Sequence, residues 1–181
     1  MARVANRVNL SREQLEDWSS KFEPPEDDEL NPTRRNDQDG ADVTDNARIL
    51  AEFMETVWNQ GDVAAVDRFL GDRYVIYSDP GDPWDGRTLS RDEFKQRLTT
   101  SRGPFPDLRF EVHETIADRD RIAIAWTMRG RQTGDVGGRP ATGRTIEVQG
   151  MTVYYFAGGR ITGHRQVVDR LTAGRQLGLA R

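Results

Sequence analysis

The sequence predicts an α+β domain in which a curved antiparallel sheet forms a cone around three N-terminal helices. From about residue 44 to residue 102, apolar residues recur at intervals of three and four, which is the spacing of amphipathic helices. After residue 103 they alternate with polar residues, as in strands that bury one face. Short turn sequences join these stretches, and a strongly twisted sheet of hairpins curls around the helices beside it.

The first predicted helix runs from about Ala47 to Trp58 and ends in an Asn-Gln-Gly-Asp sequence. The last residue of that sequence, Asp62, is a suitable N-cap for a second, shorter helix that continues to Leu70.

A short strand is predicted over residues 74–77, followed by a loop rich in proline and glycine that begins at Asp79. Ser90 and Glu93 have the spacing of a capping box, which predicts that a third helix begins there with Phe94 and Leu98 on its buried side.

Four long strands follow, joined by hairpins. In the first of them, Leu108, Phe110, Val112 and Ile116 are expected to share the buried face. Two adjacent glycines at residues 158–159 have the chemistry of a tight hairpin turn. The strands are expected over residues 108–116, 122–128, 145–156 and 161–168, with a closing helix capped by Asp169 over residues 169–177.

Composition narrows the class of protein. There are 30 acidic and 26 basic residues, and this net charge of -4 argues against binding to nucleic acid. The chain has no cysteine, which excludes disulfides, thiolate metal sites and cysteine nucleophiles. It has neither an apolar run long enough to span a membrane nor the apolar core of a signal peptide, so we expect a cytoplasmic protein without a membrane partner.

Residues 1–43 are expected to form an extension ahead of the folded domain, which we place at residues 44–181. A short amphipathic helix is predicted at about residues 11–22, where Leu15, Trp18 and Phe22 share one face. Residues 23–43 are rich in acidic residues, proline and asparagine, which is typical of a linker. The three-residue apolar face is too small to fold alone, so this helix either docks on the domain or a partner subunit, or stays mobile.

Sequence motifs give little direct chemistry. The glycine-rich loop at residues 134–143 lacks the spacing of a phosphate site, so we interpret it as a connection between strands. The two histidines, His113 and His164, lie on different strands without a ligand-spaced partner, so we expect no metal. His113 shares its strand face with charged residues, which favours a solvated or subunit-interface position.

His164 is the stronger candidate for chemistry. On the last strand it shares one face with Gln166 and Val168, and in a closed cone one face of this strand looks into the cavity. Histidine in a pocket can move protons because its ordinary pKa lies near neutral pH. A histidine that is only hydrogen-bonded is the alternative.

Large side chains provide candidate pocket walls, although the same residue types also fill cores. On the third long strand, alternation does not decide which face points inward, and a slip of one residue would reverse the assignment. The candidates for the pocket are Phe53, Trp58, Tyr77, Trp126, Met128, Thr152 and Tyr154.

Five segments, at residues 58–62, 105–114, 125–134, 140–144 and 159–178, resemble in order the SnoaL-like polyketide cyclase family of the nuclear transport factor 2-like superfamily. The resemblance covers about residues 44–179. It implies a cone-shaped α+β barrel of cystatin-like architecture, a deep apolar pocket, and a homodimer formed through the outer sheet face. It also implies cofactor-free aldol closure of a polyketide-like carbonyl compound, in which a pocket acid gives a proton to the carbonyl oxygen.

Within this resemblance His164 matches a family histidine, and the proton-transferring aspartate that follows it corresponds to Gln166. A second family histidine corresponds to Thr152. An amide can donate a hydrogen bond to an oxyanion but cannot release a proton at neutral pH.

Three functions therefore stay open. The first is an enzyme acting on an apolar carbonyl compound, with His164 as the acid/base and Gln166 as an oxyanion or orienting donor. The second is a non-catalytic binder of a small apolar molecule, and the third is an oligomeric scaffold with a filled cavity. If Trp126, Met128 and their neighbours close the cavity to less than about 300 Å³, both pocket functions fail and the scaffold is left.

Overall fold

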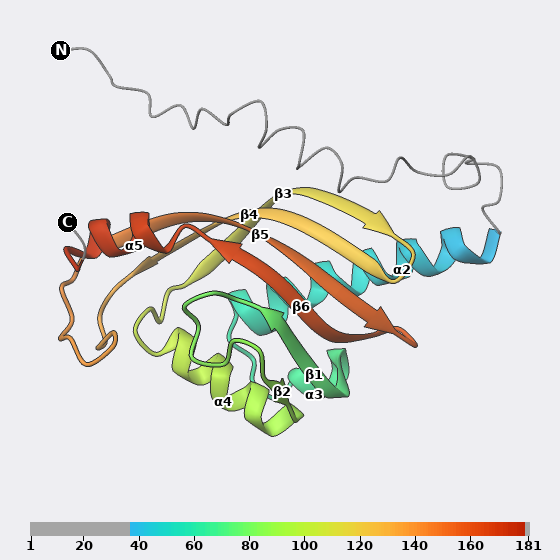
Figure 1. The fold of residues 1–181 in the computed structure, drawn as a ribbon, viewed down its shortest axis with the longest axis horizontal. Helices are drawn as coiled ribbons and strands as arrows, with labels where there is room; N and C mark the ends of the chain where they lie inside the picture. Colours follow the sequence, from blue (N-terminus) through green and yellow to red (C-terminus); the bar gives the residue numbers. More distant parts are fainter. Residues whose placement is uncertain (1–36, 180–181) are drawn as a thin grey trace, which may run out of the picture. The chain divides into compact units, whose positions relative to one another are not determined.

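The computed structural model describes residues 37–179 (Figure 1). The helix predicted at residues 11–22 and most of the predicted linker lie outside the described residues. Residues 37–43, which the sequence analysis assigned to the linker, are part of the first helix, α2 (Asp37–Phe53). This helix continues directly into a π-helical segment, η2 (Met54–Asn59), which buries Met54, Val57 and Trp58.

The second helix is shorter than predicted. Helix α3 (Val66–Phe69) ends one residue before Leu70, which adopts an extended conformation and begins strand β1 (Leu70–Ser78). Asp62 caps the preceding turn, where its carboxylate accepts a hydrogen bond of 3.1 Å from the Ala65 backbone N–H. The prediction of a strand at residues 74–77 is confirmed, and the strand extends beyond both ends of that range.

Helix α4 (Arg91–Arg102) follows the two-residue strand β2 (Thr88–Leu89) and begins as predicted. The Ser90 side chain accepts from the Glu93 backbone N–H, and the Glu93 carboxylate accepts from the Ser90 N–H at 2.8 Å. Phe94 and Leu98 are fully buried on the face that packs into the domain.

The predicted long strands form one sheet with β1 and β2, in the order β2-β1-β6-β5-β4-β3. Their hairpins pair antiparallel, as expected, but β1 pairs with β6 in parallel, so the sheet is mixed. This parallel pair joins residues about ninety positions apart, and no turn between them signals it in the sequence. The strands are β3 (Arg109–Asp118), β4 (Arg121–Arg131), β5 (Thr145–Ala157) and β6 (Arg160–Val168), and α5 (Arg170–Leu177) closes the domain.

Strand β3 departs from its predicted alternation. The register against β4 shifts between Val112 and Glu114, so His113 is a bulge residue. An extra residue reverses the faces beyond it, and Ile116 therefore lies on the outer face opposite Ala123, with 60 % of its surface exposed. The prediction that Ile116 is buried is wrong because the alternation is interrupted at His113. The predicted burial of Val112 is also wrong: this residue lies before the bulge, opposite Trp126, and is 39 % exposed on the edge strand of the sheet.

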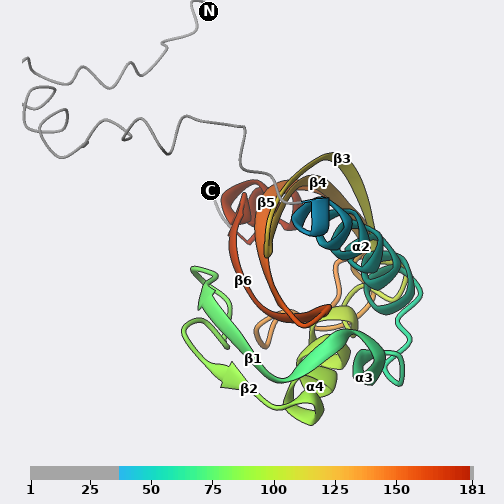
Figure 2. The same cartoon turned by 90° about the vertical axis from the view of Figure 1, so that its right-hand side faces the viewer.

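The sheet curves around an interior that α2 and α4 cover, as the end-on view in Figure 2 shows. The core lies between these layers and includes Phe53 of α2, Phe94 of α4, and Ile122 and Ile124 of β4. Three helices in the N-terminal part of the domain and a curved open sheet confirm the α+β prediction, although strands β1 and β2 of the sheet precede α4. Within residues 37–179, no helix has the length and apolar character needed to span a membrane.

Candidate functional site

An enclosed cavity lies inside the curved sheet, between the sheet, η2 and α4. Its volume is about 40 Å³, enough for one or two water molecules and far below the roughly 300 Å³ of a typical ligand pocket. It is lined by Met54, Trp58, Tyr74, Arg97, Phe110, Trp126, Tyr154, His164 and Gln166.

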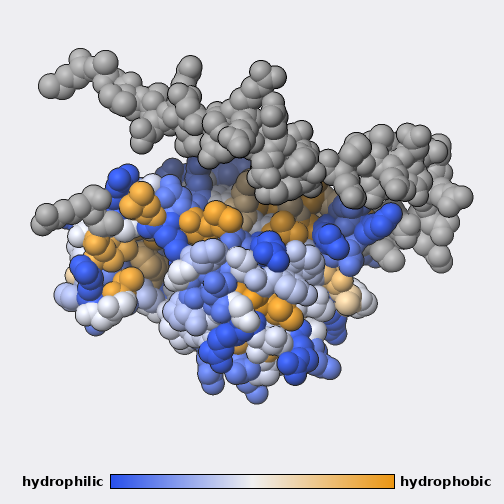
Figure 3. All heavy atoms as spheres, in the orientation of Figure 1, coloured by the Kyte–Doolittle hydropathy of each residue, from blue (hydrophilic) through white to orange (hydrophobic). Residues whose placement is uncertain are grey.

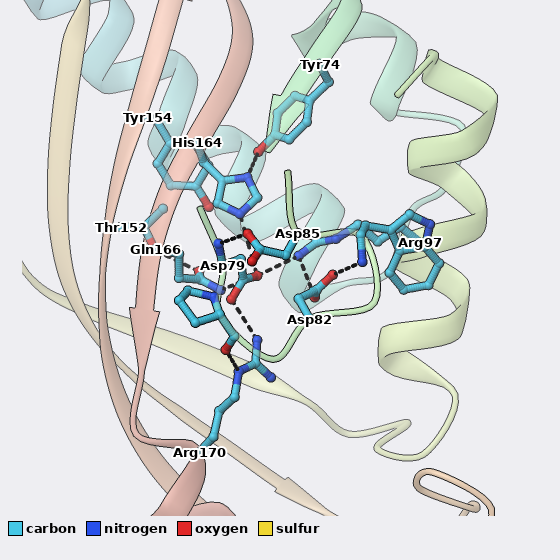
Figure 4. Close-up of polar contacts among 12 residues, drawn as sticks. Tyr74, Asp79, Asp82, Asp85, Arg97, Thr152, Tyr154, His164, Gln166 and Arg170 are labelled. Carbon is cyan, nitrogen blue, oxygen red and sulfur yellow. Dashed lines mark hydrogen bonds and ion pairs between the residues drawn. The ribbon is translucent and has the colours of Figure 1, made fainter. Parts of the chain in front are cut away.

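His164 reaches this cavity from β6 and is only 2 % exposed. Its Nδ1 lies 2.8 Å from the Tyr74 hydroxyl, which comes from the parallel neighbour β1 (Figure 4). Its Nε2 is buried without a hydrogen-bond partner among the described residues, and the nearest carboxylate oxygen, Oδ2 of Asp79, is 3.7 Å away. The ionised Asp79 favours a proton on Nε2, so that the Tyr74 hydroxyl donates to Nδ1.

The surroundings keep this imidazole neutral near pH 7. Burial is the main cause that lowers the pKa of His164, and the positive charge of Arg97 lowers it further, while Asp79 acts in the opposite direction. Burial also raises the pKa of Tyr74 well above its ordinary value, so its phenol stays protonated. A phenol can donate to or accept from Nδ1, and the imidazole can therefore present either a donor or a lone pair at Nε2.

Asp79 is the centre of the polar network behind the cavity. It follows the end of β1, is 1 % exposed, and its Oδ1 accepts from Arg170 at 2.7 Å. Its Oδ2 accepts from Arg97 at 3.2 Å and from the Gln166 amide at 3.1 Å. Burial alone would raise the pKa of Asp79, but His164 and the two arginines outweigh it and hold this pKa at about 2.

Arg97 brings a positive charge into the domain from α4. Its side chain is 5 % exposed, and one terminal nitrogen lies within 3.2 Å of Asp79 and 3.1 Å of Asp82. The guanidinium also lies over the Trp58 ring, 5.7 Å from the ring centre. Its Nε is buried and has no hydrogen-bond partner among the described residues. The cavity is therefore bordered by two side chains, Arg97 and His164, that each keep an unpaired polar nitrogen.

Gln166 is held by hydrogen bonds on both sides of its amide. The Trp126 indole N–H donates to the Thr152 hydroxyl at 2.9 Å, and that hydroxyl donates to the Gln166 oxygen at 2.8 Å. The Gln166 nitrogen then donates to Asp79. Gly150 makes room for the indole, because a Cβ at this position would overlap the Trp126 ring. This series of hydrogen bonds fixes the orientation of the Gln166 amide, with its nitrogen toward the Asp79 carboxylate.

The structure brings together five of the residues proposed from the sequence. Trp58, Trp126, Tyr154, His164 and Gln166 line the cavity.

The other four proposed residues lie elsewhere. Thr152 is buried behind Gln166 and supports it rather than lining the cavity. Phe53 is part of the core, and the half-buried Met128 packs against the core. Tyr77 was a pocket candidate, but it lies outside, 47 % exposed and against the Tyr155 ring. Because side chains alternate along β1, it is Tyr74 that points inward in its place.

Sequence reasoning missed Tyr74, Asp79 and Arg97. One signal for Arg97 was available, since it lies three residues after Phe94 on the same apolar helix face. Asp79 was interpreted as part of a turn, and its place beside Gln166 depends on the parallel pairing of β1 with β6. Nothing local in the sequence indicates that pairing.

His113 is on the outer face, where its Nε2 lies 2.7 Å from the Thr127 hydroxyl and its side chain is 45 % exposed. It has no contact with the cavity. Among residues 37–179, no three His, Cys, Asp or Glu side chains form a cluster suited to a metal ion.

Comparison with known proteins gives one consistent family. The family model of the SnoaL-like polyketide cyclases matches residues 48–177. A structure from Acidithiobacillus ferrooxidans, provisionally assigned as a polyketide cyclase, is 39% identical, with a TM-score of 0.71 over 76% of this chain and 96% of that one. Comparison with curated proteins gives no match.

Two more distant structures share the fold. A SnoaL-like polyketide cyclase from Agrobacterium tumefaciens is 21% identical, with a TM-score of 0.59 over 74% of this chain and 98% of that one. A provisionally assigned hydroxylase from Streptomyces galilaeus is also 21% identical, with a TM-score of 0.64 over 77% and 88% of the two chains. The predicted nuclear transport factor 2-like fold is confirmed by these neighbours and by the curved sheet.

Proposed function

The chain belongs to the SnoaL-like polyketide cyclase family, and within that family we propose that it is an acid/base enzyme acting on a small apolar carbonyl compound. The proposed reaction is of the aldol type and requires no cofactor. The observation that carries this proposal is the state of His164, which is buried at a cavity, fixed at Nδ1 by Tyr74, and unpaired at Nε2.

In the proposed mechanism His164 acts as a base. Because its lowered pKa leaves it neutral near pH 7, the imidazole can pass from the Nε2–H tautomer that Asp79 favours to the Nδ1–H tautomer, in which Nδ1–H donates to the Tyr74 oxygen. In that tautomer Nε2 has a lone pair that can take a proton from the carbon next to the carbonyl. The resulting enolate forms the new carbon–carbon bond, and the alkoxide produced takes the proton back from Nε2. The ionised Asp79, 3.7 Å from Nε2, stabilises the imidazolium between these two steps.

Arg97 and Gln166 are suited to the negative charge that develops on the substrate oxygen. The Arg97 Nε–H has no hydrogen-bond partner within residues 37–179, and the Gln166 amide has a second N–H besides the one that Asp79 accepts. Donors that are fixed before the reaction stabilise an oxyanion without reorganisation. Gln166 thus contributes hydrogen bonding, and His164 supplies the only proton transfer.

One observation favours a second candidate function. A cavity of about 40 Å³ is too small for an apolar carbonyl compound, so in this conformation the domain matches a scaffold with a filled interior. The enzyme proposal therefore requires that part of the cavity wall moves. Non-catalytic binding of a small apolar ligand requires the same movement, and only turnover distinguishes it from the enzyme.

We also propose that the chain forms a homodimer through the outer face of its sheet. This face exposes Ile116, Met151 and Val167, at 60 %, 58 % and 70 %, and in Figure 3 hydrophobic residues gather over β5 and β6. Met151 and Val167 are direct cross-strand neighbours, so they form a continuous apolar surface. A second copy of the chain is the partner expected from the family resemblance.

The test of the enzyme proposal is exchange of α-protons for deuterium in aromatic β-ketoesters, followed by NMR in D₂O. This exchange reports enolate formation whether or not ring closure follows. We expect His164→Gln to lower the enzyme-dependent rate by about 10²–10⁴-fold, while His113→Gln leaves it unchanged. Absence of exchange above background with the wild-type protein, despite ligand binding, would support the binder, and absence of both would support the scaffold.

A further inference from the structure

We propose that the domain has a second binding site, at the end where its hairpins turn, and that this site takes a small monocarboxylate with an apolar body. We call it the turn pocket, because two hairpin turns and one face of α2 enclose it. The inference goes beyond the proposed function, since no residue lines both the turn pocket and the cavity at His164.

The turn pocket is formed by three segments that are far apart in the chain. Its walls are α2 within residues 45–49, the β3–β4 turn at residues 119–120, and the end of β5 with its turn at residues 156–159. Both turns lie beside α2 at the right-hand end of the sheet in Figure 1. The Phe156 N–H donates to the Asp120 carbonyl at 2.7 Å, which holds the two turns together.

The size of the turn pocket suits a small molecule. Its volume is about 470 Å³, within the roughly 300–1,000 Å³ of small-molecule sites. The cavity at His164, with about 40 Å³, is far below that range. The turn pocket therefore needs no movement of its walls to admit a ligand.

The floor of the turn pocket is apolar. Phe156 is 4 % exposed, and the half-buried Ile49 lies 3.9 Å from the position that a Cβ of Gly159 would occupy. The β5–β6 turn consists of Gly158 and Gly159, whose φ angles of 54° and 69° favour glycine. This turn closes the hairpin without placing a side chain in the pocket, so the floor stays open to an apolar group.

Asn46 adds an unpaired amide beside this floor. It is 8 % exposed, yet its side chain forms no hydrogen bond with any residue of the described part of the chain. Buried side-chain amides nearly always have a partner. Because Asn46 lines the turn pocket, we infer that a bound molecule supplies that partner.

Arg119 supplies a positive charge. It is the first residue of the two-residue turn between Asp118 and Arg121, which pair across the hairpin. Its φ of 50° lies in the left-handed region, and within residues 37–179 no other non-glycine residue has a positive φ. Strained backbone of this kind concentrates at functional sites. The strain therefore favours a role for this arginine in binding.

The other charged side chains of the wall have partners of opposite charge. Arg48 contacts Glu52 at 2.8 Å and Asp45 at 3.6 Å. Asp120 contacts Arg121 at 3.7 Å. Among the described residues of the wall, Arg119 is thus the charged side chain that has no ion pair.

These groups define the class of ligand. A guanidinium without a partner can bind a carboxylate through two parallel hydrogen bonds, and the Asn46 amide can donate another. A second negative charge on the ligand would meet Asp45 and Asp120, so one carboxylate is favoured. The floor of Phe156 and Ile49 suits an apolar body such as a phenyl ring.

The experiment uses 3-phenylpropionate and its neutral analogue 3-phenylpropionamide with the full-length protein. Isothermal titration calorimetry gives their dissociation constants for wild type, Arg119→Gly, Asn46→Ala and Arg139→Gly. Glycine adopts the left-handed backbone of residue 119 readily, so Arg119→Gly removes the guanidinium and keeps the turn. Arg139→Gly is the matched control, because it removes the same charge from an exposed position outside the turn pocket.

We expect wild type to bind 3-phenylpropionate with a dissociation constant of about 1 mM or lower, and 3-phenylpropionamide at least about tenfold more weakly. Arg119→Gly should weaken binding of the carboxylate at least about tenfold and Asn46→Ala about threefold, with Arg139→Gly unchanged. In NMR spectra the backbone amides of Gly158 and Gly159 should shift on binding, while the His164 imidazole should not.

Four results would overturn the inference: no binding by wild type, equal binding of carboxylate and amide, equal affinities of Arg119→Gly and Arg139→Gly, or shifts at His164 in place of the turn glycines. If Arg119→Gly fails to fold by circular dichroism, Arg119→Asn replaces it with the same expected loss, because asparagine also tolerates left-handed backbone.

The two proposals fail separately. If 3-phenylpropionate binds at the turn glycines but no α-proton exchange occurs, the turn pocket stands and the enzyme proposal falls. If exchange depends on His164 while Arg119→Gly leaves binding unchanged, the enzyme proposal stands and the turn pocket falls.

Discussion

The amide nitrogen of Gln166 donates a hydrogen bond of 3.1 Å to the Asp79 carboxylate, although 87 residues separate the two in the chain. Gln166 is at the position where the family resemblance leads one to expect an aspartate. The carboxylate at this end of the cavity comes instead from the end of β1. It stays ionised and paired with two arginines, so Asp79 orients the Gln166 amide and stabilises positive charge on His164, and it does not carry protons.

Replacing Asp79 by asparagine should destabilise the domain strongly, because it removes one of the two carboxylates beside the buried Arg97. We expect a loss of about 3 kcal/mol in the free energy of unfolding, the lower end for a broken buried ion pair, since Asp82 still contacts Arg97. Urea denaturation at pH 7 measures it. Asp72→Asn is the control, because that exposed carboxylate pairs with Arg91 at the surface. Equal stability of the two variants would contradict the prediction.

Gln166→Asp should place a second carboxylate against Asp79. Like charges at this distance raise the pKa of one member of the pair, so the destabilisation is full above that raised pKa and shrinks as the pH falls through it. The stability difference from wild type should therefore narrow between pH 8 and pH 5 in urea titrations. Gln149→Asp, at an exposed position of β5, should show no such narrowing. A difference that stays constant with pH would show that the two carboxylates do not meet.

Protonation of His164 should cost stability. Its pKa is lowered in the folded state, so below its ordinary value of 6.5 the unfolded chain binds more protons and stability falls as the pH falls. When the free energy of unfolding is measured by urea denaturation between pH 7.5 and 5.5, this fall with decreasing pH should be absent in His164→Gln and present in His113→Gln. The α-proton exchange rate should fall only below the lowered pKa of His164. An unchanged slope in His164→Gln would contradict the buried, neutral histidine.

Protonation of Asp79 should cause a second loss of folding stability at lower pH. Its carboxyl has a pKa of about 2 in the folded state against an ordinary value of 3.8, so its contribution is present above 3.8 and is lost as the pH falls toward 2. The shift corresponds to about 2 kcal/mol. Urea titrations from pH 4 to pH 2 should show this loss in wild type but not in Asp79→Asn. If the free energy of unfolding falls equally with pH in both proteins, the prediction is wrong.

Gly150→Ala should disturb Trp126, because the added methyl group would overlap the indole ring and approach the Val167 carbonyl oxygen. We expect the free energy of unfolding to fall by about 1–3 kcal/mol. The tryptophan fluorescence spectrum should change as well, because the hydrogen bond from the Trp126 indole to Thr152 is strained. Gly71→Ala is the control, since a Cβ there meets its nearest atom at an ordinary 3.4 Å. Similar effects of both substitutions would mean that the close approach of Trp126 is not what Gly150 provides.

A charge on the outer sheet face should weaken the proposed homodimer. Val167→Asp and Met151→Asp are expected to raise the dimer dissociation constant at least tenfold, measured by sedimentation equilibrium. Leu171→Asp, at an exposed apolar position on α5, should leave it unchanged. A wild-type chain that sediments as a monomer would refute the dimer.

The sequence by itself determined the local elements. The capping box at Ser90 and Glu93, the glycine hairpin before β6, and the shared face of His164 and Gln166 depend on neighbouring residues, and all are present in the structure. The family resemblance added the fold, which the comparisons confirm.

Only the tertiary structure decided which groups meet. The parallel pairing of β1 with β6 brings Tyr74 and Asp79 to His164, and the bulge at His113 turns Ile116 outward. The size of the cavity depends on how Phe110, Trp58 and Trp126 pack together. Periodicity in a sequence reports which way a side chain faces within its own strand or helix. Strand pairing, an inserted bulge residue and the filling of space depend on contacts between segments far apart in the chain, and no local pattern encodes them.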